Sequence, residues 1–465
     1  MSTELISLLV LALIFVIATF VPINIGALAF VAAFVLGSTA LGLSADEILK
    51  GFPAGLAVTL IGITYLFAIA QNNGTIDWLV GLAVRAVQGR LVVIPWIMFA
   101  VSGALTAAGA VSPAAVAIIA PIALGFAYRY RISPLLMGLM VIHGAQAGGF
   151  SPISIYGSIT NKIVSDSQLP SSPATLFLTS LLFNLAIAVI AFLLLGGPAL
   201  LRRRAGDPDA AEALAVAAPA ATPATSSAHG AGLHPHPDQR AQTVSTGVRG
   251  AAVVGATTEQ DSPEQTVATP YRVLTLLGLV GLAAGTLVFD LDVGLTALTV
   301  AVVLALVSPH AQRKAVTQVS WPVVLLITGV LTYISVLQKI GTITYVSDAI
   351  SRVGSPLVAA LLLFFLGAIV SAFASSTALL GALIPLAVPF LLTGNISAIG
   401  VIAGLAVSAT VVDVSPFSTN GAIVLANARE AEKDAFYAKL LRVGIAVVVI
   451  APIVAWLVMV VPGWL

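Results

Sequence analysis

Cysteine is absent from the 465-residue chain, and charged residues account for only 8% of it. Without cysteine the protein can form no disulfide, no thiolate metal site and no cysteine nucleophile. An ordinary soluble domain is about 25% charged, so this chain lacks the usual surface of a soluble protein. The formal net charge of +1 gives no reason to expect nucleic acid as a partner.

Hydrophobic residues make up 59% of the chain, and apolar runs recur along most of its length. Runs of about 17–22 residues are long enough to cross the hydrocarbon core of a bilayer. We therefore predict an all-α polytopic membrane protein surrounded by lipid. The expected spanning helices lie near residues 5–21, 23–43, 55–71, 174–197, 272–289, 292–308, 319–338 and 438–461. Weakly amphipathic stretches near 75–88 and 341–352 suit the membrane interface better than a span.

Two parts of the chain repeat the same pattern. Ser151 and Ser415 are 264 positions apart, and the same offset aligns the Ser-Pro-x-Ser-x-x-Gly motifs around them. Upstream, an offset of 267 pairs Gln71 with Gln338. We predict a first transmembrane repeat over 1–197 and a second over 271–465. Between them, residues 198–270 are rich in Ala, Pro, Thr and Ser, which predicts a disordered linker.

Each predicted repeat contains a pair of apolar arms, at about 91–127 and 356–392. If each pair is a re-entrant hairpin, each repeat has five spans, and the odd number inverts the second repeat relative to the first. If the arms are full spans, the repeats are parallel. Under the hairpin arrangement, sixteen of the 20 Lys and Arg residues share one face, and the other face holds Lys50, Lys162, Lys339 and Arg352. The positive-inside rule then favours hairpins, a cytoplasmic linker and both termini outside.

The two Ser-Pro-x-Ser-x-x-Gly motifs interrupt the predicted broken helices near 133–166 and 396–428. Proline removes a backbone donor and glycine permits positive φ, so the helix should unwind there. Unwound carbonyls and hydroxyls suit a monovalent cation, and the following helix N-terminus suits a carboxylate. A plain proline kink is the alternative, but two interruptions in register favour function. The motif residues expected to bind a cation or take part in coupling are Ser151, Pro152, Gly157, Ser415, Pro416 and Gly421.

Few ionisable residues lie at membrane depth, and such residues are functional candidates by default. Asp413 lies just before the second break and could bind a cation, carry a proton or cap the turn. His143 and Gln146 lie one helical turn apart on the first broken helix. They are candidates for contact with a substrate carboxylate, with interhelical hydrogen bonding as the alternative.

The tip between the second pair of arms carries hydroxyls at a helix N-terminus, an arrangement suited to anions. The segment Phe373-Ala-Ser-Ser-Thr-Ala-Leu-Leu-Gly381 resembles the Ser-Asn-Thr hairpin tip of the divalent-anion/sodium symporters. Ser415-Pro-Phe-Ser-Thr-Asn-Gly-Ala-Ile-Val424 is similar to the second signature of that family. The first tip reads Val111-Ser-Pro113, and Ser376 stands where that family has asparagine. Within this superfamily, the chain outside the linker most resembles the malonate/dicarboxylate carrier family.

The resemblance implies an elevator-type secondary carrier for malonate or a C4-dicarboxylate, driven by Na⁺ or H⁺, with no other cofactor. It assigns substrate contacts to residues at the tips and breaks: Ser112, Ser375, Ser376, Thr377, Ser154, Ser418, Thr419 and Asn420. The expected protein is a homodimer in a bacterial-type inner membrane. A cation/proton antiporter or an inorganic-anion carrier of the same superfamily is the alternative. An integral-membrane enzyme is a weaker one, because no Ser/His/Asp set or metal-binding cluster is visible at membrane depth.

Overall fold

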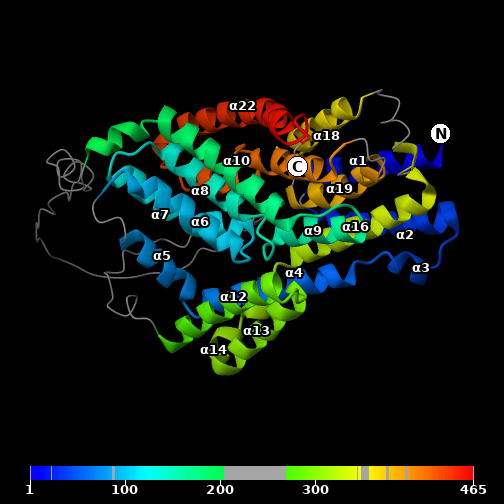
Figure 1. The fold of residues 1–465 in the computed structure, drawn as a ribbon, viewed down its shortest axis with the longest axis horizontal. Helices are drawn as coiled ribbons and strands as arrows, with labels where there is room; N and C mark the ends of the chain where they lie inside the picture. Colours follow the sequence, from blue (N-terminus) through cyan, green and yellow to red (C-terminus); the bar gives the residue numbers. More distant parts are fainter. Residues whose placement is uncertain are drawn as a thin grey trace, which may run out of the picture.

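The computed structural model describes residues 2–21, 23–85, 90–203, 269–342, 344–346, 355–372, 376–392 and 396–463, and every regular element in these ranges is helical (Figure 1). The predicted all-α architecture is therefore confirmed. The linker between the halves lies almost entirely outside the described residues, as does most of the 341–352 stretch.

In the first half, the helices occupy the places that apolar runs predicted. They are α1 (Thr3–Phe20), α2 (Ile25–Leu41), α3 (Ala45–Leu49), α4 (Ala54–Asn72), α5 (Thr75–Arg85), α6 (Val93–Ala107), α7 (Ser112–Arg129), α8 (Pro134–Gly148), α9 (Ile155–Asp166) and α10 (Pro173–Leu194), followed by η1 (Gly197–Arg202). The short α3 was not predicted. It begins with a capping box, in which Ser44 and Glu47 satisfy each other's backbone N–H groups.

The second half of the described chain is helical as well. Its helices are α12 (Pro270–Val288), α13 (Val293–Val307), α14 (Pro309–Gln312), α15 (Ala315–Gln318), α16 (Trp321–Ile340), α18 (Pro356–Ser371), α19 (Ser376–Leu392), α20 (Ala398–Val411), α21 (Thr419–Ala426) and α22 (Lys433–Met459), with η3 (Glu430–Glu432) before α22. The last helix begins at Lys433, earlier than the expected 438, because an amphipathic turn precedes its apolar run.

The helices pack as two bundles, each built from both halves of the chain. In the first, which we call the α4 bundle, α4 packs on α13, α2 packs on α16, and α1 and α12 join α2 and α13. In the second, the α8 bundle, α6, α7 and α10 surround α8, and α18 and α22 flank α20. The two bundles meet mainly where α19 packs on α16 and where α9 packs on α4.

Glycines allow the closest helix crossings within each bundle. A Cβ added to Gly329 of α16 would lie 2.0 Å from the carbonyl oxygen of Gly26 in α2, and one on Gly148 would lie 2.0 Å from that of Gly103. Between the bundles the neighbours are side chains: a Cβ on Gly381 of α19 would lie 3.3 Å from Cδ1 of Ile327. Close backbone crossings therefore occur within each bundle, whereas the glycine contacts between the bundles are made with side chains.

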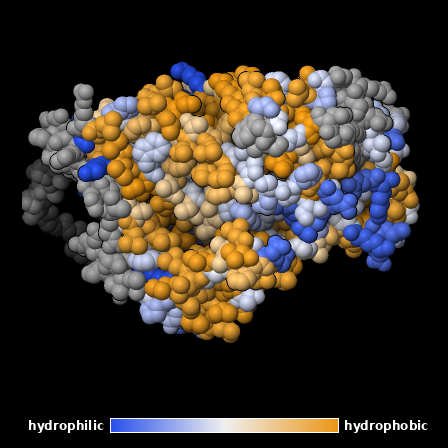
Figure 2. Space-filling view, viewed as in Figure 1, coloured by the Kyte–Doolittle hydropathy of each residue, from blue (hydrophilic) through white to orange (hydrophobic). Residues whose placement is uncertain are grey.

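Six helices of the described residues are long and apolar enough to cross a membrane: α4, α7, α10, α12, α16 and the helix ending at Met459. Eight further apolar helices are shorter, including both pieces that precede the breaks, α8 and α20. Figure 2 shows that hydrophobic residues dominate one face of the molecule, whereas hydrophilic residues gather toward the end that carries α3. This surface fits a multi-pass membrane protein.

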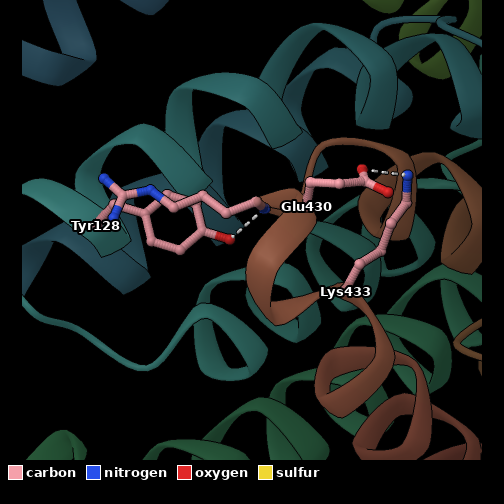
Figure 3. Close-up of polar contacts among 4 residues, drawn as sticks. Tyr128, Glu430 and Lys433 are labelled. Carbon is pink, nitrogen blue, oxygen red and sulfur yellow. Dashed lines mark hydrogen bonds and ion pairs between the residues drawn. The ribbon is translucent and has the colours of Figure 1, made fainter. Parts of the chain in front are cut away.

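A hydrogen bond and a cation–π contact connect the C-terminal end of α7 to the segment that follows α21. The backbone N–H of Arg429 donates to the Tyr128 hydroxyl at 2.9 Å, and the Arg429 guanidinium lies 4.1 Å from the centre of the Tyr128 ring. Next to these contacts, Lys433 forms a salt bridge with Glu430 at 3.1 Å, as Figure 3 shows. The contact attaches the first pair of arms to the second half of the chain.

Candidate functional site

The first break separates α8 from α9 and is organised by Ser154. The Ser154 hydroxyl donates to the carbonyls of Gly149 and of Ser151, the latter at 2.7 Å. As the N-cap residue of α9, it also accepts the N–H of Gly157 at 3.3 Å. Ser151 is turned toward the tip of the first arms, where its hydroxyl donates to the Ala107 carbonyl at 2.8 Å.

The second break separates α20 from α21 and repeats this geometry. The Ser418 hydroxyl donates to the Ser415 carbonyl at 2.6 Å and accepts the N–H of Gly421 at 3.4 Å. A Cβ on Gly421 would lie 1.9 Å from the Ser415 carbonyl oxygen, and one on Gly157 would lie 2.0 Å from that of Ser151. The predicted breaks are confirmed, but the reason for their glycines was wrong. Neither Gly157 nor Gly421 has positive φ; each is needed because the unwound chain passes too close for a side chain.

The centre of the site is a chain of buried polar groups that joins both breaks to the first tip. Gln146 Nε2, from the last turn of α8, donates to Asp413 Oδ2 at 3.0 Å. The N–H of Asn420 donates to Asp413 Oδ1 at 3.3 Å. Asn420 Nδ2 then donates to Ser112 Oγ, at the start of α7, at 2.8 Å. Gln146 and Asn420 are fully buried, and Asp413 and Ser112 are nearly so.

Within this series of buried polar groups, two acceptors have no partner among the described residues, namely Gln146 Oε1 and Asn420 Oδ1. Buried polar atoms are normally paired, so a site with spare acceptors and a carboxylate lacks a positive or hydrogen-donating group. A monovalent cation or a proton would supply that group. These oxygen atoms are therefore suitable ligands for the expected coupling ion, and Asp413, Gln146 and Asn420 are the residues that would hold it.

The second tip is described only in part, because Ser375 lies outside the described residues. Ser376 begins α19, and its hydroxyl lies 2.9 Å from that of Ser371 at the end of α18. Ser376 and Thr377 are both buried. Since α19 packs on α9, this tip lies near the first break, whereas Ser112 of the first tip meets the second break. Thr419, by contrast, is exposed.

His143 does not belong to this chain of contacts. Its Nδ1 lies 2.9 Å from Asn184 Oδ1 on α10, and Asn184 Nδ2 donates to the Ser180 carbonyl at 2.9 Å. The interhelical alternative therefore describes His143, while Gln146, one turn later, lies in the site. The contact between Gln146 and Asp413 was not predicted, because the offset of 264 that aligns the two breaks pairs Asp413 with Gly149 instead.

A cavity of about 330 Å³ lies between the first tip and the α4 bundle. On one side it is lined by Gly109, Val111, Pro113 and Ala114, the residues on both sides of Ser112. On the other side it is lined by residues of α4 and of the α15–α16 segment: Thr64, Phe67, Ala68, Gln71, Gln318, Ser320 and Val323. No lining residue is charged. Neither Gln71 nor Gln318 was predicted to belong to the site, because their helices carry no break.

The comparisons with known proteins bear on the first part of the chain. No curated protein matches the chain. Residues 1–149, which end at the first break, match the family described as the N-terminus of the dicarboxylate carrier protein MatC. Over this first part the chain thus matches a dicarboxylate carrier family, in line with the resemblance of its tip and break motifs.

Proposed function

We propose that this protein is a secondary carrier that moves a small dicarboxylate, malonate or a C4 acid, across a membrane together with Na⁺ or H⁺. The match of residues 1–149 to a dicarboxylate carrier supports the class of function. The buried chain from Gln146 through Asp413 and Asn420 to Ser112 is the observation that supports the site. It places a carboxylate, spare acceptors and a tip hydroxyl beside two helix N-termini, which suits a cation and an anion together.

We further propose that the two repeats are inverted and that the arms α6–α7 and α18–α19 are re-entrant hairpins. In Figure 1 the first pair lies on the left of the view and the second on the right, as expected for hairpins that enter from opposite faces. One observation favours the alternative for α7, which at 18 residues could span by length alone. In this topology both termini lie outside and the linker is cytoplasmic. The proposed protein is also a homodimer.

The packing supports an elevator mechanism. Close backbone crossings at glycines occur within each bundle, whereas the glycine contacts between the bundles are made with side chains such as Ile327. An assembly of this kind can slide at the boundary between its bundles while each bundle keeps its shape. The α8 bundle, which holds the site, would move against the α4 bundle.

Transport in proteoliposomes tests the function directly. Labelled malonate and succinate should accumulate when a Na⁺ or proton gradient is imposed, and without the gradient they should only equilibrate. If the protein takes up neither acid under either gradient, the proposed function is wrong. Cation/proton antiport is the second candidate, because the Asp413 site could serve it without an anion. Proton efflux driven by Na⁺ in the absence of any dicarboxylate would favour that candidate.

A further inference from the structure

The cavity beside the first tip has two unlike walls. The tip wall consists of Gly109, Val111, Pro113 and Ala114, which offer no polar side chain. The opposite wall belongs to the α4 bundle and carries four neutral polar side chains: Thr64, Gln71, Gln318 and Ser320. Among the described residues that line the cavity, side-chain hydrogen-bonding groups therefore lie on the opposite wall.

One of those four polar side chains, that of Thr64, already has partners in the structure. The Thr64 hydroxyl donates to the Leu60 carbonyl at 2.7 Å and accepts the N–H of Ser320 at 3.3 Å. Gln71 and Gln318 are different: both are exposed, and neither carboxamide has a hydrogen bond to any residue that the structure describes. Their amide N–H groups, together with the hydroxyl of Ser320, are the donors that this wall can offer to a ligand.

The tip wall supplies the complementary feature. Val111 precedes the 18-residue helix α7, and no side chain caps the helix at that position. Because the peptide dipoles of α7 add up, its N-terminus favours negative charge. A carboxylate at this end would leave the rest of a short molecule directed toward the glutamines. Carboxamides donate to a carboxylate without the charge of lysine or arginine, so they can recognise it and still release it.

We infer that Gln71 and Gln318 select for a second carboxylate, so that the cavity distinguishes small dicarboxylates from monocarboxylates of the same length. This inference rests on the proposed function and adds to it a pair of specificity-determining residues outside the α8 bundle. It also gives the α4 bundle a part in recognition, although none of its residues belongs to the breaks or tips.

The chain offers a matched control for this inference. Gln338 is the repeat counterpart of Gln71, with Gly74-Thr-Ile and Gly341-Thr-Ile following the two glutamines in the same register. Gln338 is likewise exposed, near the end of α16, but it does not line the cavity. A substitution there makes the same chemical change at an equivalent place without altering the wall.

The test compares Gln71→Leu, Gln318→Leu and Gln338→Leu in proteoliposomes. Uptake of labelled malonate is measured in competition with unlabelled malonate and with unlabelled propionate, which has the same chain length and one carboxylate. Each cavity variant should weaken the apparent affinity for malonate about tenfold, as expected for one hydrogen bond to a charged group. The affinity for propionate should not change, so the preference for the dicarboxylate falls. Gln338→Leu should behave like the wild type.

A second pair of variants distinguishes a loss of substrate recognition from a general disturbance of the cavity. Gln71→Glu and Gln318→Glu keep the size of the side chain but place a negative charge opposite the second carboxylate. They should reject malonate more strongly than the leucine variants do and should affect propionate less.

The outcomes separate this inference from the proposed function. Malonate preference that survives in both leucine variants overturns the inference alone, as does an equal loss of malonate and propionate binding. A wild-type protein that takes up no dicarboxylate overturns the proposed function and this inference together.

Discussion

Asn420 Nδ2 donates a hydrogen bond of 2.8 Å to Ser112 Oγ across 308 positions of sequence. The bond joins the tip of the first arms to the broken helix of the second half. Neither half of the chain can therefore assemble this part of the site alone.

Removing this bond should weaken transport more than folding. We expect Asn420→Ala to lower the apparent substrate affinity roughly ten- to a hundredfold, because it also removes the unpartnered Oδ1. Ser112→Ala should cost less, since a neutral hydrogen bond contributes about 0.5–1.5 kcal/mol. Uptake by the two single variants and the double variant gives the coupling energy of the pair. Asn427→Ala is the control, because its exposed side chain bonds, among the described residues, only to the Ile423 carbonyl. Additive effects in the double variant would show that the bond has no part in transport.

Replacing Asp413 by asparagine should separate coupling from exchange. The carboxylate accepts from Gln146 and from the N–H of Asn420, and asparagine can keep one of these bonds. We therefore expect folded protein that has lost ion-driven accumulation. If Asp413 carries a proton, substrate exchange should survive; if it binds Na⁺, the sodium requirement of both uptake and exchange should rise. Unchanged ion dependence of both activities would show that Asp413 only caps the turn.

A cross-link between the α4 bundle and the α8 bundle should stop transport if transport requires the two bundles to slide past each other. Ile327 and Gly381 meet across the boundary, and the chain has no native cysteine, so Ile327→Cys/Gly381→Cys can be bridged by Hg²⁺ without background. We expect the bridged protein to lose uptake and to regain it when a thiol removes the metal. The control pair is Gly367→Cys/Ala409→Cys, within the α8 bundle. There an added Cβ would lie 3.6 Å from that of Ala409, within the range of disulfides, and the cross-link should leave transport intact. Uptake by the bridged Ile327/Gly381 protein would contradict the elevator mechanism.

The glycine crossing between α2 and α16 should be sensitive to a single methyl group. Gly329→Ala would place its Cβ 2.0 Å from the Gly26 carbonyl oxygen, so the helices must separate. Overpacking of this kind costs at least about 1–3 kcal/mol. Gly281→Ala, in α12, meets no described residue within 4 Å and should stabilise its helix slightly. Thermal unfolding in detergent should show a lower midpoint for Gly329→Ala only; equal midpoints would mean that the crossing is not close-packed.

The sequence alone determined the all-helical membrane architecture, the positions of most helices and the two breaks. Long apolar runs and Ser-Pro-x-Ser-x-x-Gly motifs act through local physics, because hydrophobic length and proline geometry need no distant partner. The tertiary structure decided which groups meet. It paired Gln146 with Asp413 and Ser112 with Asn420, and it turned His143 toward Asn184 instead. It also brought Gln71 and Gln318 to the tip cavity. Such contacts depend on how helices of both halves pack side by side, and that packing has no signature in the spacing of residues along one helix.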